Sequence, residues 1–325
     1  MKYLSEKRGV DAWWGVYPEH HGDLVSMSYL DFVPAFKHIE GPTLTKRTYS
    51  GPANTVLYLD GDSYTQHLDT ALLSGLAAYH YISRYEPSSY HLDTTKNNIL
   101  VIEIAERIFR PYFDSVRMIH DLIDTKPVAL TINPYVAHTA YAAMLPTMGN
   151  LFNSNINQNL QFNLFNYQFI MPLFESKAAL NYYAFKRASG RVVISDDGSF
   201  LFLKETVSNT GTSSVYARLT QSDLTLLVNN LNITYDHFRA AGFKEVYLSV
   251  IPGAATIVQS KGYNNLIPLV QNDPRLKIKI IDVYSAFRNN PEQLYQPGDT
   301  HWNNKGIQIF IDLLDKVIVQ SNEHS

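Results

Sequence analysis

The sequence predicts an α/β protein in which helices cover both faces of a mostly parallel sheet. Residues 98–104 are nearly continuous apolar, which is typical of a strand buried on both faces. Short β-prone runs recur along the chain with helical segments between them, and this alternation favours a parallel sheet. The chain has 325 residues, of which 45% are hydrophobic and 18% charged, so it can bury a substantial core.

The elements can be placed in order from their periodicity and turn signals. A helix-compatible stretch follows Ser63 and continues to residue 78, and residues 220–241 have helical spacing that Gly242 is placed to end. A last amphipathic helix is expected from about Asn303. Residues 191–195 and 200–203 flank an Asp-Gly turn and predict a β-hairpin. Strands of the main sheet are expected at residues 55–59, 79–85, 98–104, 245–251 and 277–283.

The same pattern indicates how the chain is organised. Residues 1–54 are irregular and broken by two Gly-Pro pairs, so we expect an arm that wraps a domain rather than a domain. Residues from about 108 to 215 interrupt the alternation of strands and helices. We therefore expect one α/β domain, residues 55–325, that carries a large insertion.

Composition excludes several classes of function. The net charge of −3 argues against nucleic acid as a partner. The absence of cysteine excludes disulfides, thiolate zinc sites and cysteine nucleophiles. The sequence shows neither an apolar run that could span a bilayer nor a signal peptide at its start. No metal or other cofactor is expected.

A first candidate catalytic segment follows the first strand of the main sheet. Ser63 stands in the sequence Asp60-Gly-Asp-Ser-Tyr64, at the strand end where open α/β sheets bind their ligands. There the start of the expected helix could offer free N–H groups to a negatively charged oxygen. The alternative is that Ser63 only caps that helix.

A second segment precedes the last helix, in the sequence Gly298-Asp-Thr-His-Trp-Asn303. An imidazole can take the proton of a serine hydroxyl at neutral pH, and a carboxylate can hold that imidazole in the correct tautomer. Asp299 and His301 are two residues apart, so in an extended segment both side chains can point the same way. The alternatives are a polar helix entry or a metal site, although we find no further ligands at suitable spacing.

Together the two segments resemble the SGNH (GDSL-like) hydrolase superfamily, and more narrowly its branch of alginate O-acetylation and DHHW proteins. Residues 103–107, 191–203, 246–252 and 281–285 resemble further elements of that branch. Two departures stand beside the resemblance. Many members of the branch have the serine segment after the histidine segment, and the superfamily's oxyanion asparagine is not visible here, with Asn133 as a possible replacement.

The resemblance implies a flavodoxin-like three-layer α/β/α sandwich and a Ser63–His301–Asp299 triad. Arg107, Asp62, Tyr64 and Trp302 become candidates for holding the oxyanion or the substrate, although Arg107 could instead pair with Glu103 or Glu106. Trp302 could either pack to position its loop or border the substrate.

The expected chemistry is that of a carbohydrate O-acetyl esterase or acetyltransferase acting through an acyl-serine. The expected partners are an acylated carbohydrate and, for a transferase, a membrane protein that donates acetyl groups, in an extracytoplasmic setting. A catalytically silent carbohydrate-binding protein is the rival interpretation.

Overall fold

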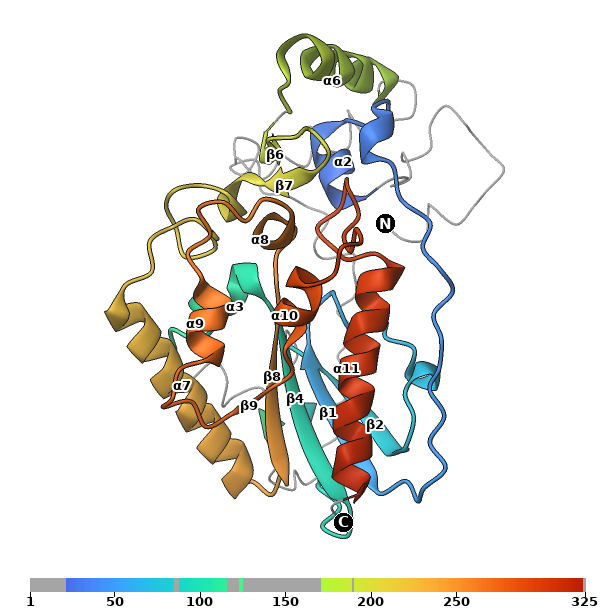
Figure 1. The fold of residues 1–325 in the computed structure, drawn as a ribbon, viewed down its shortest axis with the longest axis vertical. Coiled ribbons are helices and arrows are strands. Elements are labelled where there is room, and N and C mark those ends of the chain that lie inside the picture. Colours follow the sequence, from blue (N-terminus) through green and yellow to red (C-terminus); the bar gives the residue numbers. More distant parts are fainter. Residues whose placement is uncertain (1–21, 85–87, 116–122, 125–170, 189, 324–325) are drawn as a thin grey trace, which may run out of the picture.

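The computed structural model describes residues 22–84, 88–115, 123–124, 171–188 and 190–323 (Figure 1). Its centre is a five-stranded sheet in which every pair of neighbouring strands is parallel. The strand order is β2-β1-β4-β8-β9, which confirms the predicted fold class. The strands are β1 (Thr55–Gly61), β2 (Leu76–Ser83), β4 (Asn97–Ala105), β8 (Glu245–Ile251) and β9 (Lys279–Ile280).

Helices cover both faces of this sheet, because alternate side chains of the central strand enter two different cores. Leu100 and Ile102 of β4 pack in a core with α3 (Glu106–Tyr112), α7 (Gln221–Ala240) and α9 (Leu266–Gln271). Ile99 and Val101 pack in a second core on the opposite face. That core includes residues of α8 (Ala254–Val258), α10 (Val283–Arg288) and α11 (Asn304–Glu323). The result is a three-layer sandwich.

A third, smaller hydrophobic cluster lies beyond the carboxyl ends of the strands (Figure 1). It joins α2 (Asp23–Ser28) of the expected arm to α6 (Met171–Phe185) and to an antiparallel hairpin. The hairpin strands are β6 (Val192–Ile194) and β7 (Leu201–Leu203), as the Asp-Gly turn predicted. The remaining strands in the described residues are β3 (Ser88–Ser89) and β5 (Ile123–Asp124). The described residues also form three short 3-10 helices, η1 (Pro34–Phe36), η2 (Thr70–Leu72) and η4 (Lys204–Thr206).

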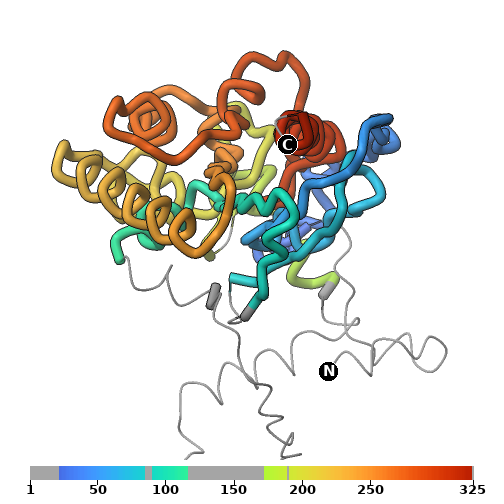
Figure 2. Tube along the Cα trace, turned by 90° about the horizontal axis from the view of Figure 1, so that it is seen from below, coloured from blue at the N-terminus to red at the C-terminus, as the bar shows by residue number. Residues whose placement is uncertain are grey.

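The N-terminal segment, residues 22–54, wraps the domain. After η1 it runs without regular structure beside α11, and the view from below shows it next to that helix (Figure 2). Thr45 and Gln308 exchange two hydrogen bonds there, and Arg47 pairs with Asp312. The described part of this segment thus lies along α11, and it contains the short helix α2 and the 3-10 helix η1. Residues 1–21 and much of the expected insertion lie outside the described residues.

Two sequence-based predictions are wrong. No α-helix follows Ser63: residues 62–68 form turns, and η2 is the one helical element before β2. Asp69 caps η2, and Gly75 at φ 73° redirects the chain, so local side-chain bonds replace a continuous helix. The last strand is also shorter than expected, because Asp282 caps α10 immediately after Ile281.

In the described part of the chain, every helix is too short or too polar to pass through a lipid bilayer.

Candidate active site

Ser63 lies in the serine loop, residues 62–65, which leaves the carboxyl end of β1. Asp62 shapes this loop: its Oδ1 accepts the N–H of Tyr64 at 3.0 Å, and its carbonyl accepts the N–H of Thr65 at 3.1 Å. The flanking Asp62 and Thr65 are buried, while Ser63 is exposed. The loop therefore presents the serine hydroxyl outward from a buried base.

Glu103, at the end of β4, holds the serine loop from below. Its Oε2 accepts the N–H of Asp62 at 3.0 Å and the hydroxyl of Thr65 at 2.9 Å. Burial, together with the nearby charge of Asp62, raises the pKa of Glu103 to about 8. Its other oxygen has no hydrogen-bond partner among the described residues, which a neutral carboxyl tolerates better than a carboxylate.

Arg84 supplies the positive charge in this buried region. Its guanidinium donates to the carbonyls of Asp60 and Glu103 and lies 3.4 Å from the Asp60 carboxylate. Burial raises the pKa of Asp60, and the attraction of Arg84 opposes that rise. The ends of β1 and β4 are thus joined by a charged network that fixes the base of the serine loop.

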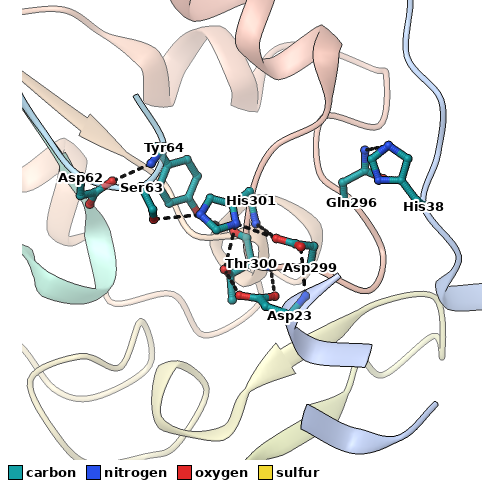
Figure 3. A network of polar contacts seen from close by, with 9 residues as sticks. All are labelled: Asp23, His38, Asp62, Ser63, Tyr64, Gln296, Asp299, Thr300 and His301. Atoms are coloured by element: carbon teal, nitrogen blue, oxygen red, sulfur yellow. Dashed lines mark hydrogen bonds and ion pairs between the residues drawn. The ribbon is translucent and has the colours of Figure 1, made fainter. Parts of the chain in front are cut away.

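His301 reaches Ser63 from the histidine loop, residues 298–303, at the far end of the sequence (Figure 3). Its Nε2 lies 2.9 Å from Ser63 Oγ, and its Nδ1 lies 2.6 Å from Asp299 Oδ1. Both distances are those of hydrogen bonds, so a continuous chain joins the hydroxyl, the imidazole and the carboxylate. The three residues that the sequence singled out are brought together.

Asp299 is oriented by the backbone as well as by the imidazole. Its Oδ1 also accepts the main-chain N–H of His301 at 2.9 Å, so the two side chains share a side because the loop bends, not because it is extended. Burial acts to raise the pKa of Asp299, but the hydrogen bonds from His301 outweigh it and hold this pKa below its usual value. The carboxylate is therefore ionised at neutral pH.

Tyr64 and Trp302 pack around the imidazole. The Tyr64 ring lies 4.8 Å from the His301 ring, and its hydroxyl donates to the carbonyl of Thr300 at 2.5 Å. Trp302 contacts Tyr64 edge-on at 5.1 Å and is 5% exposed, with Phe310 on its other side. Burial raises the pKa of Tyr64 far above its usual value, with Arg107 acting against the rise, so its hydroxyl stays a donor.

Asp23 also belongs to this site, although it stands in no sequence motif that would have indicated it. Its N–H donates to Asp299 Oδ2 at 3.0 Å, and its carboxylate accepts the N–H and the hydroxyl of Thr300 at 2.8 and 2.6 Å (Figure 3). The next two N–H groups, of Leu24 and Val25, both donate to the carbonyl of Gly298. The start of α2 is thus bonded to the histidine loop across more than 270 residues of sequence.

Arg107 is placed differently from the other candidates. It lines a pocket with Tyr64, Asp299 and Thr300, and Ser63 is not among the residues that line this pocket. Among the described residues it has no ion-pair partner, because Glu103 is bonded to the serine loop and Glu106 accepts bonds from Gly253 and Thr256. The expected alternative, in which Arg107 forms an ion pair with Glu103 or Glu106, is therefore wrong. The Arg107 guanidinium remains open to a ligand.

A second hollow lies on the Ser63 side of Tyr64 and has an empty volume of about 670 Å³. Ser63, His301 and Trp302 border this hollow, which we call the Ser63 groove. Trp302 therefore both packs against the residues that position the histidine loop and borders the groove. The other walls are mainly apolar and come from three parts of the chain: Leu44 of the N-terminal segment, Leu68 and Leu72 after the serine loop, and Ile307 of α11.

The serine loop, residues 62–65, offers one free main-chain donor for an oxyanion at Ser63. The N–H of Ser63 has no partner among the described residues, whereas the N–H groups of Tyr64, Thr65 and Gln66 all bond to Asp62. This donor comes from a turn and not from the start of a helix. Asn133, the possible further donor, lies outside the described residues.

Asp23, Asp299 and His301 place ligand atoms within 4.8 Å of one another, a spacing that could suit a metal ion. Each of these carboxylate oxygens already accepts a hydrogen bond, and both imidazole nitrogens have partners. The cluster is therefore complete as a hydrogen-bond network.

Comparisons with protein-family models, with curated proteins and with solved structures found no match for this chain.

Proposed function

We propose that this protein is a serine-dependent acyl-transfer enzyme, with Ser63 as nucleophile, His301 as general base and Asp299 as the group that orients His301. One observation carries the proposal: the unbroken hydrogen-bond chain from Ser63 Oγ through the imidazole to the Asp299 carboxylate. A serine hydroxyl needs such a base, and the base needs such a partner. The exposure of Ser63 at the border of a groove makes the hydroxyl accessible to a substrate.

The reaction follows from these positions. His301 Nε2 takes the proton of Ser63 Oγ as this oxygen attacks the carbonyl carbon of an ester. The N–H of Ser63 donates to the oxyanion that forms, and Asp299 stabilises the imidazolium. His301 then returns the proton to the departing alcohol, which leaves an acyl-serine. Water, or the hydroxyl of a second alcohol, then attacks the acyl carbon while its proton passes to His301, and His301 returns that proton to Ser63 Oγ as the bond between Oγ and the acyl group breaks.

The substrate class rests on the resemblance of the two sequence segments. This resemblance supports an O-acetylated carbohydrate as the substrate if the protein is an esterase. If the protein is a transferase, the resemblance supports an O-acetylated carbohydrate as the product and a membrane partner as the source of acetyl groups. Both activities use the same residues and differ in how well water is kept from the acyl-enzyme. The same resemblance supports an extracytoplasmic location.

The direct experiment is mass spectrometry of the intact protein after incubation with p-nitrophenyl acetate or a fluorophosphonate. We expect one adduct on the parent and on Ser222→Ala, which removes an exposed serine of α7, and none on Ser63→Ala. Ester turnover should fall on the order of a thousand-fold or more in Ser63→Ala and in His301→Ala, and less in Asp299→Asn. An adduct that persists in Ser63→Ala would show that the nucleophile is assigned wrongly.

A catalytically silent carbohydrate-binding protein is the second candidate, and it is favoured because the serine loop, residues 62–65, has a single free main-chain donor for an oxyanion. This candidate expects no adduct on the parent, together with carbohydrate binding that Ser63→Ala leaves unchanged. Calorimetric titration with acetylated and deacetylated oligosaccharides would separate the two candidates.

A further inference from the structure

The carboxylate of Asp23 acts on one residue of the histidine loop, Thr300, which stands between Asp299 and His301. Its Oδ1 accepts the main-chain N–H of Thr300 at 2.8 Å, and its Oδ2 accepts the Thr300 hydroxyl at 2.6 Å. Both donors of this one residue are therefore directed to the two oxygens of one carboxylate. Such a two-point contact fixes the rotation of the Thr300 peptide as well as its position.

The backbone of Asp23 acts on the neighbouring residue. Its N–H donates to Asp299 Oδ2, while Asp299 Oδ1 faces the imidazole and the N–H of His301. The carboxylate of Asp299 is thus held from both sides and cannot rotate away from the imidazole without breaking one of these bonds. Asp23 therefore constrains both residues that precede His301.

We propose that Asp23 is a positioning residue for acyl transfer: by bonding Thr300 and Asp299 it holds His301 Nε2 within hydrogen-bond distance of Ser63. This inference rests on the proposed function and adds to it a residue from the N-terminal segment. Asp23 does not touch the reacting atoms. Its effect is on geometry, to which turnover responds steeply because small displacements of a catalytic group slow the reaction severely.

The contribution of the Asp23 carboxylate can be separated from the folding of α2. Leu24 and Val25 are 1% and 0% exposed in the third hydrophobic cluster, and their N–H groups bond to Gly298. None of these contacts involves the Asp23 side chain. A substitution of that side chain should therefore leave α2 docked while it releases Thr300.

The test compares Asp23→Ala, Asp23→Asn and a control in the same helix, Met27→Ala, whose side chain is 41% exposed. For p-nitrophenyl acetate we expect kcat of Asp23→Ala to fall on the order of a hundred-fold with KM within about two-fold. Asp23→Asn keeps an acceptor for the Thr300 N–H and should recover to within about five-fold of the parent. Met27→Ala should match the parent.

A double substitution shows whether the effect passes through Thr300. Thr300→Val removes the hydroxyl that Asp23 accepts and a longer contact, 3.4 Å, of that hydroxyl with His301 Nδ1. Adding it to Asp23→Ala should therefore cause much less loss than it causes in the parent, because the shorter of the two bonds is already gone. Additive losses would overturn the proposal, as would an Asp23→Asn protein as slow as Asp23→Ala. A parent that forms no Ser63 adduct would instead refute the proposed function, whereas an adduct that forms equally fast in Asp23→Ala would refute the positioning role alone.

Discussion

A Cβ atom added at Gly61 would lie 2.1 Å from Thr65 Oγ1 and 3.2 Å from Glu103 Oε2. The glycine of the Gly-Asp-Ser sequence is therefore required by close approach, since Thr65 and Glu103 hold the serine loop at this point. Asp62 is structural as well, because its carboxylate accepts the main-chain N–H of Tyr64 in the serine loop and that of Ala105 at the end of β4. The three-residue motif thus combines one exposed reactive group with two residues that shape its support.

Gly61→Ala is expected to lower the free energy of unfolding by about 1–3 kcal/mol, because the added methyl overpacks a closed site. Gly253→Ala is the matched control: a Cβ there meets its nearest atom at 3.6 Å, so the cost should stay below about 1 kcal/mol. Urea unfolding of both variants checks this. Equal losses in the two proteins would mean that the Thr65 contact relaxes freely.

Sequence reasoning found Ser63, Asp299 and His301 because each lies in a short local motif with a chemical requirement behind it. Asp23 stands in no such motif, and its role depends on contacts with residues about 277 positions away. The role of such a residue follows from its position in the folded structure, and no periodicity or spacing in the sequence indicates it. The open position of Arg107 is undetectable for the same reason, since nearby glutamates in the sequence suggested a pair.

At the scale of elements, β1 and β4 are buried along their whole length, and their carboxyl ends carry the charged groups that support the site. These strands were predictable because their apolar runs have no alternation. The helix expected after Ser63 was not formed, because side chains of Asp62, Thr65 and Asp69 bond locally or to Glu103 and compete with helical bonds. Periodicity alone does not reveal that competition.

The burial of Glu103 has a consequence for the pH dependence of stability. Its pKa is about 8 in the folded protein and near 4.5 in the unfolded chain, so the folded state favours the protonated carboxyl. The resulting stabilisation is complete below about pH 4.5 and is lost as the pH rises through 8. We expect the parent to lose several kcal/mol of its free energy of unfolding over this range.

Glu103→Gln keeps an acceptor oxygen and cannot ionise, so its stability should depend much less on pH. Urea unfolding at pH 5, 7 and 9 of the parent and of this variant provides the measurement. A parent and variant with parallel pH profiles would show that Glu103 does not titrate in this window.

On the scale of the whole molecule, the N-terminal segment and α11 close the domain around the sheet. Asn322, near the end of α11, accepts bonds from the N–H of Asn54 and the hydroxyl of Thr55 and donates to the carbonyl of Gly75. These buried or half-buried contacts join the end of α11 to the starts of β1 and β2. Asp312, also in α11, forms an exposed ion pair with Arg47 of the N-terminal segment.

Asn322→Ala should lower the free energy of unfolding by about 1–3 kcal/mol, because it leaves buried polar groups without partners. Arg47→Ala should change it by less than about 1 kcal/mol, as exposed ion pairs contribute little. Denaturant unfolding at two salt concentrations compares them, and only the small effect of Arg47→Ala should depend on salt. A larger loss for Arg47→Ala than for Asn322→Ala would contradict this account.

The hydrogen bond between Ser63 and His301 spans 238 positions of sequence. The loop that carries His301 is bonded to the start of α2, and α11, which follows this loop, is bonded to the N-terminal segment. A ribosome releases the serine loop long before it releases the histidine. If the proposed function holds, ester turnover by a nascent chain should be absent until the histidine loop and α11 have been synthesised. Under the proposed function, activity would therefore report that α11 has been made and folded.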